Sequence, residues 1–313
     1  MKQFGLIGVS GYIAPRHLQA IKDTANNLMV SNDISDSVGV IDSFFPQSEF
    51  FTNLEDFKSF IKSSKVKLDY LTVCSPNFLH KDHILLGLEN NIEVICEKPL
   101  VTSLKDFYSL ENFSERYSQK INTILQLRLH PSIISLKNEI SNRDNNKIID
   151  VDLTYITSRG KWYNNSWKGD FDKSGGIALN IGIHFFDMLI FIFGDVKKSV
   201  TNYRSLSKAG GVLEFENARV RWFLSIDEKD LNLNCRQAGK KTFRSILIDG
   251  KEFEFSDGFT DLHTQSYSEI IKGKGFSLKE SKNSIELALK IMSDDCLGIK
   301  GDFHPYLKKI NYK

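Results

Sequence analysis

The sequence is poor in the residues that would point to metal chemistry or to an oxidising compartment. It has four cysteines among 313 residues (Cys74, Cys96, Cys235 and Cys296), and no two of them form a C-x-x-C pair. The ligand spacing of a structural zinc site and the motif of thiol exchange are therefore missing. We expect no bound metal, and we expect free thiols in the reducing environment of the cytoplasm.

The sequence also lacks an excess of charge and a long hydrophobic run. Lys and Arg number 41 and Asp and Glu number 39, for a net charge of +2, which argues against a nucleic-acid partner. The longest apolar stretch, 183–193, contains His184 and Asp187 and is about half as long as a membrane span, so it predicts a buried helix. Because a strand pattern begins directly after Met1, we expect no signal peptide, no membrane association and a cytoplasmic location.

The first part of the chain alternates short apolar runs with amphipathic stretches. This alternation is typical of βαβ units, which build a doubly wound parallel sheet. The predicted strands are 4–9, 27–33, 70–74, 93–96 and 122–127, and the predicted helices are 15–24, 54–63, 81–90 and 104–117. We therefore expect an α/β protein that begins with a Rossmann domain over residues 1–123.

The remaining residues, 124–313, have a different pattern, in which strands follow one another with few helices between them. The predicted strands are 150–157, 212–215, 220–226, 245–248 and 252–255, and the predicted helices are 178–193 and 264–272. Turn signals such as Asp249-Gly250 separate the strands, which is typical of antiparallel pairing. We expect an α+β domain with an open, mostly antiparallel sheet that binds the substrate and forms the oligomer.

A glycine-rich loop follows the first predicted strand. Residues 8–14 read G-x-x-G-x-x-A, a variant of the dinucleotide-binding fingerprint. Small residues let the backbone turn tightly and approach a pyrophosphate at the N-terminus of the next helix. Because the loop opens the first βαβ unit, the pattern favours cofactor binding over a purely structural turn. The candidate cofactor-binding residues here are Gly8, Ser10, Gly11, Tyr12, Ile13 and Ala14.

An acidic residue ends the second predicted strand. Asp33 lies about 20 residues after the loop, where a carboxylate accepts hydrogen bonds from the adenosine ribose. A 2′-phosphate would meet negative charge there, so the sequence favours NAD over NADP. Asp36 is an alternative if the strand ends later, and a turn cap is the structural alternative for Asp33.

Polar clusters follow two later strands, at the edge of the sheet where ligands bind in open α/β folds. The candidate cofactor-binding residues in these clusters are Ser75, Pro76, Asn77, His80, Glu97 and Lys98, with Gln126 at the end of the last strand. A lysine in a cofactor cleft costs desolvation unless it has a task or a partner. The alternative for Lys98 is a surface ion pair with Glu97. His83 lies one helical turn from His80, but the two have no third metal ligand in view.

The second domain contributes a histidine on an apolar predicted helix. Asn180 and His184 are four residues apart, so on an α-helix they project from the same face. A histidine titrates near neutral pH and can accept a hydroxyl proton as hydride leaves. A buried core histidine is the structural alternative.

Cationic and aromatic residues alternate just before this helix. Cations can bind a carboxylate or a diphosphate, and aromatic faces can stack on a ring or cover a sugar. A solvated loop with buried tryptophans is the alternative. The substrate-binding candidates are Arg159, Trp162, Tyr163, Trp167 and Lys168, together with Arg128, Asn180 and His184.

Four motifs, in this order along the chain, resemble those of the Gfo/Idh/MocA oxidoreductase family. They are the loop 8–14, Ser75-Pro76-Asn77-x-x-His80, Glu97-Lys98-Pro99 and Asn180-x-Gly-x-His184. Segments 11–17, 33–39, 156–163 and 166–170 resemble one branch of the family. That branch contains the UDP-N-acetyl-2-amino-2-deoxy-D-glucuronate dehydrogenases of bacterial lipopolysaccharide (O-antigen) biosynthesis.

The resemblance implies that NAD takes a hydride while the sugar C3 hydroxyl becomes a ketone. It also implies that Lys98 and His184 form the catalytic pair and contact the substrate. Many relatives have an aspartate at the position of Asn180; an amide cannot act as a base, so Asn180 should only orient the sugar. Some members of the branch regenerate NAD with 2-oxoglutarate, and the family usually forms homodimers or homotetramers. Two alternatives remain open: a dehydrogenase of a free sugar or inositol, and a non-catalytic NAD-binding protein.

Overall fold

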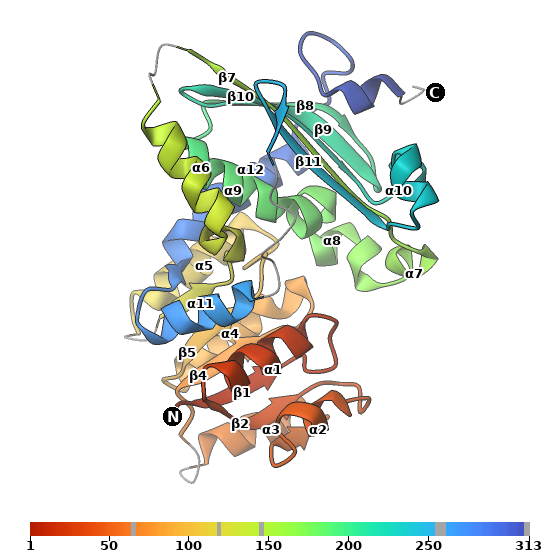
Figure 1. Cartoon of the computed structure of the whole chain (residues 1–313). Helices are drawn as coiled ribbons and strands as arrows, with labels where there is room; N and C mark the ends of the chain where they lie inside the picture. The colour runs from red at the N-terminus through yellow and green to blue at the C-terminus, as the bar shows by residue number, and fades with distance from the viewer. Residues whose placement is uncertain (64–66, 118–119, 144–146, 254–260, 310–313) are drawn as a thin grey trace. The chain divides into compact units, whose positions relative to one another are not determined.

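The computed structural model describes the chain except residues 64–66, 118–119, 144–146, 254–260 and 310–313. The chain forms two compact units (Figure 1). Unit 1 comprises Met1–Leu129 and Phe259–Lys282, and unit 2 comprises His130–Gly258 and Asn283–Lys313. The chain therefore passes between the units three times. This division differs from a single boundary after residue 123, because a late segment returns to unit 1.

Unit 1 is built on a seven-stranded sheet with the order β13-β6-β5-β4-β1-β2-β3. All of its strands are parallel except β13, which pairs antiparallel with β6. The strands are β1 (Gln3–Ile7), β2 (Asn27–Asn32), β3 (Glu49–Phe51), β4 (Tyr70–Val73), β5 (Glu93–Cys96), β6 (Ile121–Thr123) and β13 (Phe276–Ser277). The order reverses between β1 and β4, which is the point where doubly wound sheets bind ligands.

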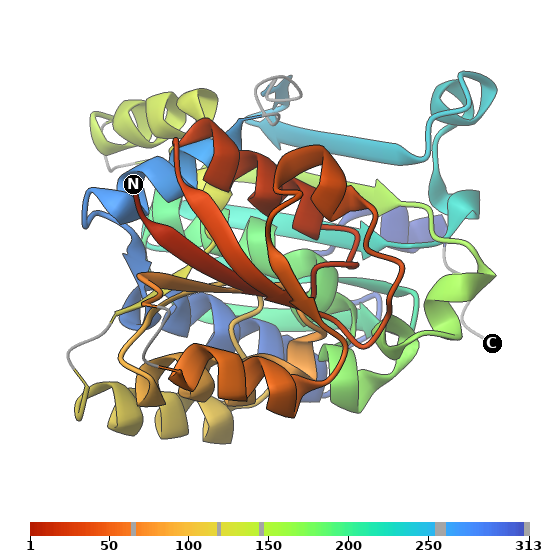
Figure 2. The same ribbon diagram turned by 90° about the horizontal axis from the view of Figure 1, so that it is seen from below.

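Helices cover both faces of this sheet (Figure 2). The helices are α1 (Ala14–Asp23), α2 (Val40–Phe44), α3 (Leu54–Lys62), α4 (His80–Glu89), α5 (Leu104–Ser114) and α11 (Leu262–Ile271). Helix α1 packs against α2 and α11 on one face. From β1 to β3 the chain moves toward one edge of the sheet, and after β3 it crosses back to β4 and moves toward the other edge. Because the connections are right-handed, this change of direction places α3, α4 and α5 on the other face.

The segment that returns to unit 1 is anchored by its apolar side chains. Tyr267 and Ile270 of α11 lie in the same buried cluster as Phe4 of β1 and Leu18 of α1. The sequence predicts the helix itself, over 264–272, but assigns it to the second domain. Its burial against α1 is the physical reason why it belongs to unit 1.

Unit 2 is built on a six-stranded sheet with the order β12-β11-β7-β10-β9-β8. The strands are β7 (Ile149–Thr157), β8 (Lys198–Arg204), β9 (Lys208–Glu214), β10 (Ala218–Ser225), β11 (Thr242–Ile248) and β12 (Lys251–Glu252). Among the strand pairs that the structure describes, only β7–β10 is parallel, so the predicted mostly antiparallel sheet is confirmed. The sequence predicts no strand at β8. Residues 254–255 of the predicted strand 252–255 lie outside the described residues.

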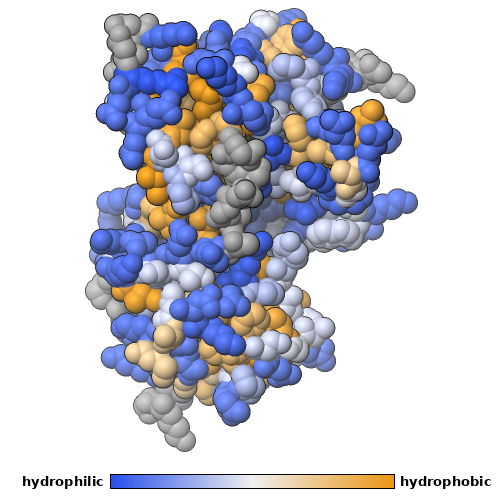
Figure 3. Space-filling view, in the orientation of Figure 1, coloured by the Kyte–Doolittle hydropathy of each residue, from blue (hydrophilic) through white to orange (hydrophobic). Residues whose placement is uncertain are grey.

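One helical layer of unit 2 packs against this sheet. Phe186 of α9 meets Trp222 of β10 edge-on, with ring centroids 5.2 Å apart. The helices of unit 2 as a whole are α6 (Pro131–Ser141), α7 (Lys161–Asn164), α8 (Phe171–Ser174), α9 (Ile183–Phe193), α10 (Leu233–Gln237) and α12 (Leu278–Ser293), of which α12 begins in unit 1. The sequence patterns predict neither α6 nor α12. On the face of the molecule drawn in Figure 3, hydrophilic residues cover much of each unit.

The apolar segment Phe171–Phe193 is long and apolar enough to cross a membrane by length and composition alone. However, 72% of its most apolar window is buried inside the structure. A buried core helix passes the same test, so the finding is weak evidence for a membrane span.

The predicted helix over 178–193 is confirmed, but its first turn is π-helical and not α-helical. Residues Ala178–Gly182 form a π-helical turn, and the α-helix α9 begins at Ile183. Gly182 lies close to the sheet, where a Cβ atom would come within 2.6 Å of the Leu224 side chain. Such single π-turns inside helices are frequent at functional sites.

Candidate functional site

The glycine loop of unit 1 has the geometry that the sequence predicts. Gly8 has a φ of +90°, and a Cβ atom there would lie 2.6 Å from the backbone of Cys74 and Ser75. A Cβ atom on Gly11 would lie 3.0 Å from the Gly8 carbonyl oxygen. Helix α1 begins directly after the loop, and its N-cap residue Ile13 provides no side-chain cap. The first N–H groups of α1 therefore suit a phosphate group.

Asp33 ties the end of β2 to this loop. One carboxylate oxygen accepts a hydrogen bond from the Ser10 backbone N–H at 3.0 Å, and the other accepts one from Ser35 N–H at 3.0 Å. A carboxylate can accept about four hydrogen bonds, so acceptor capacity remains for ribose hydroxyls. The turn-capping and ribose-binding interpretations of Asp33 are therefore compatible. Asp36 is exposed.

The polar residues after β4 are mostly engaged with the protein itself. The ring of His80 is buried between two backbone carbonyl oxygens, of Pro99 and of Ser75, each at 2.8 Å. Its pKa is lowered by burial. The Ser75 hydroxyl is 2.8 Å from Nδ1 of His83, whose pKa burial lowers to about 4. His80 thus holds the loops after β4 and β5 together. In the same cluster Pro76 is half-buried and Asn77 is buried.

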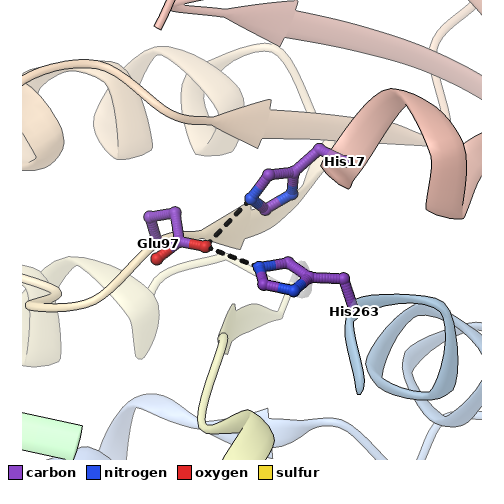
Figure 4. A group of neighbouring side chains, drawn as sticks. All are labelled: His17, Glu97 and His263. Atoms are coloured by element: carbon purple, nitrogen blue, oxygen red, sulfur yellow. Dashed lines mark hydrogen bonds and ion pairs between the residues drawn. The ribbon is translucent and has the colours of Figure 1, made fainter. Parts of the chain in front are cut away.

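Glu97 is buried at the end of β5 and is bound by two histidines that the sequence analysis does not single out. Its Oε1 accepts hydrogen bonds from Nε2 of His17 at 2.9 Å and of His263 at 3.1 Å (Figure 4). Its Oε2 accepts one from the backbone N–H of Lys98 at 3.1 Å. Glu97 therefore fixes the start of the Lys98 loop, a role that differs from direct cofactor binding. Lys98 itself is half-buried.

Two further candidates of unit 1 lie in the 3₁₀ turn η2 (Gln126–Leu129), after β6. The side-chain oxygen of Gln126 is buried and has no hydrogen-bond partner among the described residues. It could accept a hydrogen bond from a bound amide group. Arg128 is engaged differently, since its guanidinium donates to the Glu280 carbonyl oxygen at 3.0 Å and lies over the Phe276 ring. Arg128 therefore anchors the segment that returns to unit 1.

Three features of unit 1 suit NAD. The tight loop suits the pyrophosphate, Asp33 suits the ribose, and the buried oxygen of Gln126 needs a donor such as a carboxamide. All of these groups follow the carboxyl ends of parallel strands, which is the ligand edge of a doubly wound sheet. The described residues of unit 1 fit the cofactor.

In unit 2, the candidate residues Asn180 and Tyr163 contact each other. The buried Asn180 side chain donates a hydrogen bond to the Tyr163 hydroxyl at 2.7 Å. Burial raises the pKa of Tyr163, so this hydroxyl stays protonated at neutral pH. Asn180 lies in the π-helical turn, and His184 is half-buried in the first turn of α9.

Tyr163 also lines a cavity of about 640 Å³ in unit 2. The cavity is lined by Arg159, Gly160, Lys161, Tyr163, Asn164, Ser207, Ile226, Asp227, Glu228, Lys229 and Arg236. Each of its two acidic residues pairs with a lysine that does not line the cavity, Asp227 with Lys208 at 3.2 Å and Glu228 with Lys241 at 2.8 Å. Arg159 and Arg236 have no carboxylate partner among the residues that the structure describes. The cavity is therefore suited to an anion.

The remaining aromatic candidates of unit 2 lie beside this cavity in sequence but do not line it. Trp162 is 55% exposed and meets Tyr163 edge-on. The Lys168 ammonium lies 4.0 Å from the Trp167 ring centroid, a cation–π contact. The sequence does not predict the cations Lys229 and Arg236 of the cavity as substrate-binding residues. They lie in the polar segment after β10, which contains no motif that indicates a binding site.

The fold and unit 1 define an NAD-binding oxidoreductase of the Rossmann type. Residues 2–122 match the sequence model of the Gfo/Idh/MocA oxidoreductase family, NAD-binding Rossmann fold, and residues 137–232 match that of its C-terminal alpha/beta domain. The chain belongs to the Gfo/Idh/MocA oxidoreductase family. The family and the cofactor that the sequence predicts are confirmed.

Two solved structures of the WlbA (WbpB) dehydrogenase from Thermus thermophilus are similar to the whole chain. One, in complex with NAD and alpha-ketoglutarate, is 43% identical, with a TM-score of 0.93, and the match covers 98% of this chain and 100% of that one. The other, in complex with NAD and UDP-GlcNAcA, is 42% identical, with a TM-score of 0.92 and the same coverage.

A curated relative is the glucose-6-phosphate 3-dehydrogenase of Bacillus subtilis, which is 30% identical over 200 residues. The match covers 62% of this chain and 54% of the relative. The chain thus spans about half the length of that relative.

Proposed function

We propose that this protein oxidises the C3 hydroxyl of UDP-N-acetyl-2-amino-2-deoxy-D-glucuronate to a ketone in lipopolysaccharide biosynthesis. The observation that carries the proposal is the full-length similarity to a dehydrogenase solved with NAD and UDP-GlcNAcA, at 42% identity. The cavity of unit 2 supports it, because its cationic lining suits a substrate that carries a carboxylate and a diphosphate. NAD, when bound, accepts the hydride that leaves C3.

The protein's own contribution is to bind the sugar and to take the hydroxyl proton. We assign that proton transfer to Lys98 and His184, since a neutral amine or imidazole group can accept a proton near neutral pH when its environment tunes its pKa. The Asn180 amide cannot act as a base. Its hydrogen bond to the Tyr163 hydroxyl fixes the orientation of the amide, so we assign Asn180 to orienting the sugar as a hydrogen-bond donor and acceptor. We assign Arg159 to the anionic part of the substrate, because it lines the cavity.

A further part of the proposal concerns the fate of the reduced cofactor. We propose that 2-oxoglutarate reoxidises it, with the keto group of the acid becoming a hydroxyl. One of the Thermus structures contains NAD and alpha-ketoglutarate together, which supports this. We also propose a cytoplasmic homodimer or homotetramer. Light scattering coupled to size exclusion tests the assembly; a monomer at micromolar concentration contradicts it.

The test of the activity is a substrate panel. UDP-sugars with and without the C6 carboxylate, glucose 6-phosphate and inositol are each incubated with NAD, with and without 2-oxoglutarate, and NADH absorbance is followed. We expect turnover with the UDP-sugar acid and multiple turnovers when 2-oxoglutarate is present. Faster oxidation of a free sugar, of inositol or of glucose 6-phosphate would contradict the proposal.

The role of Lys98 has its own variant. Lys98→Ala should reduce turnover by about a hundredfold to ten-thousandfold, the range that a proton-transfer group contributes, and NAD binding should remain measurable. Lys105→Ala, at an exposed position of α5, is the control. Near-normal turnover of Lys98→Ala would remove this residue from the mechanism.

A further inference from the structure

Three side chains from distant parts of the sequence meet inside unit 1. His17 comes from α1, Glu97 from the end of β5 and His263 from α11, and all three point toward one another (Figure 4). Their exposed fractions are 0%, 5% and 4%. Their ligand atoms lie within 4.8 Å of one another, a spacing that could also hold a metal ion.

The hydrogen bonds of this trio are explained without a metal ion. Burial by itself raises the pKa of Glu97, but the hydrogen bonds from His17 and His263 outweigh it, so the pKa lies well below its usual range. An ionised carboxylate only accepts hydrogen bonds, so both Nε2 atoms donate to it. Burial lowers the pKa of His17, and in its neutral form Nδ1 accepts a hydrogen bond from the Tyr267 hydroxyl at 2.8 Å.

The network ends inside the protein. The Tyr267 hydroxyl oxygen is 2.8 Å from the Thr72 hydroxyl, which lies in the middle of β4 and is fully buried. The other end, Nδ1 of His263, is buried and has no hydrogen-bond partner among the described residues. A proton that entered the network would have no described route to solvent. Among the described residues, the network is therefore suited to holding a fixed geometry.

The group that the network holds is the backbone of Lys98. One oxygen of Glu97 is occupied by the two histidines, and this fixes the other oxygen, which accepts the Lys98 backbone N–H. The orientation of the carboxylate therefore sets the position at which the chain enters the Lys98 loop.

We propose that His17 and His263 are positioning residues that act through Glu97 to place Lys98 for proton transfer. The proposal rests on the catalytic role assigned to Lys98 above. His263 is the more informative of the two, because it lies on the segment that returns to unit 1 late in the chain, and Glu97 is the partner of its Nε2 atom.

The variants separate a lost hydrogen bond from a lost side chain. His263→Leu keeps similar bulk but removes the donor to Glu97, whereas His263→Gln retains an N–H donor. The matched control is His304→Leu in unit 2, since His304 is also buried, at 2% exposed, and its ring nitrogen is 3.1 Å from the Thr154 hydroxyl. The control reports the general cost of deleting a hydrogen-bonded buried histidine.

Two measurements test the proposal in the full chain. The first is steady-state kinetics with the UDP-sugar acid. His263→Leu should lower kcat by about tenfold to a hundredfold, which is the range for losing a hydrogen bond to a charged group. The NAD dissociation constant of this variant should stay within about threefold of wild type. His263→Gln should recover most of the rate, and His304→Leu should leave kcat unchanged. The second is hydrogen exchange at the Lys98 amide, which should accelerate at least about tenfold in His263→Leu and return toward wild type in His263→Gln.

Three results would overturn the proposal. One is unchanged kcat and unchanged Lys98 amide exchange in His263→Leu. Another is a His263→Gln variant as impaired as His263→Leu, with NAD binding lost in both, which would mean a merely structural role. A third is about one equivalent of a divalent metal in the purified wild-type protein by elemental analysis. If wild type does not turn over the UDP-sugar acid, the proposed function fails, while amide exchange still decides whether the trio places Lys98.

Discussion

The strictest requirement in the cofactor site is the absence of a side chain at Gly8. Its φ of +90° is in the region that favours glycine, and an added Cβ atom would lie 2.6 Å from backbone atoms of Cys74 and Ser75. Backbone atoms cannot rotate away as the end of a side chain can. For Gly8→Ala to fit, the loop or the end of β4 must move by about 0.8 Å to restore an ordinary contact.

The cost of Gly8→Ala follows from these two effects. The left-handed backbone costs about 1–2 kcal/mol for a residue with a Cβ atom, and overpacking adds about 1–3 kcal/mol. We expect unit 1 to lose about 2–5 kcal/mol of its free energy of unfolding. The shifted loop should also lose a charge-assisted hydrogen bond to the cofactor phosphate, which weakens NAD binding by about tenfold to a hundredfold.

The assay compares Gly8→Ala with Gly39→Ala in the same unit. Gly39 has a φ of −55°, and a Cβ atom there meets nothing within 4 Å, so its replacement should change stability by less than about 0.5 kcal/mol. NAD affinity is measured by calorimetry, and unfolding in urea is followed by far-UV circular dichroism. If Gly8→Ala binds NAD within about threefold of wild type and unfolds at the same urea concentration, the reasoning is wrong.

Two other predictions concern single carboxylate and imidazole groups. Asp33→Ala should weaken NAD binding and reduce the preference for NAD over NADP, because it removes negative charge near the ribose and the acceptor for Ser10 N–H. The ratio of the dissociation constants of NAD and NADP is measured for this variant and for the control Asp36→Ala, at an exposed position. An unchanged ratio in Asp33→Ala would move the ribose contact elsewhere. Burial lowers the pKa of His304 from 6.5 to about 4, so between these pH values the unfolded chain binds a proton that the folded chain does not. Stability should therefore fall by about 3 kcal/mol from pH 6.5 to pH 4 on account of His304, and His304→Gln should lose this part of the fall. Tryptophan fluorescence measures it, since Trp162, Trp167 and Trp222 all lie in unit 2; the same pH dependence in the variant would contradict the assignment.

The cofactor half of the protein could be predicted from sequence because its signals are local. A loop that reads G-x-x-G-x-x-A between a strand and a helix leaves few backbone solutions, and the structure places Gly8 and Gly11 as the pattern requires. The polar residues after β4 and β5 were found because parallel strands bring their carboxyl ends to one edge. The pattern does not predict which residue each of these polar side chains contacts. Arg128, for example, is a candidate for substrate binding, but in the structure its guanidinium donates to the carbonyl oxygen of Glu280, 152 residues away.

The sequence alone therefore determined the alternation of strands and helices in the first 123 residues, the family motifs and the choice of NAD, all of which depend on short-range periodicity and on residues close in the chain. Only the tertiary structure decided that α11 joins unit 1, that the helix before His184 opens with a π-turn and that Glu97 is held by His17 and His263. The physical reason is that the sequence of an amphipathic helix shows which face of the helix will be buried. It does not show which other element of the protein will cover that face. A hydrogen bond across 166 residues, such as His263 to Glu97, follows from that packing and from no local pattern.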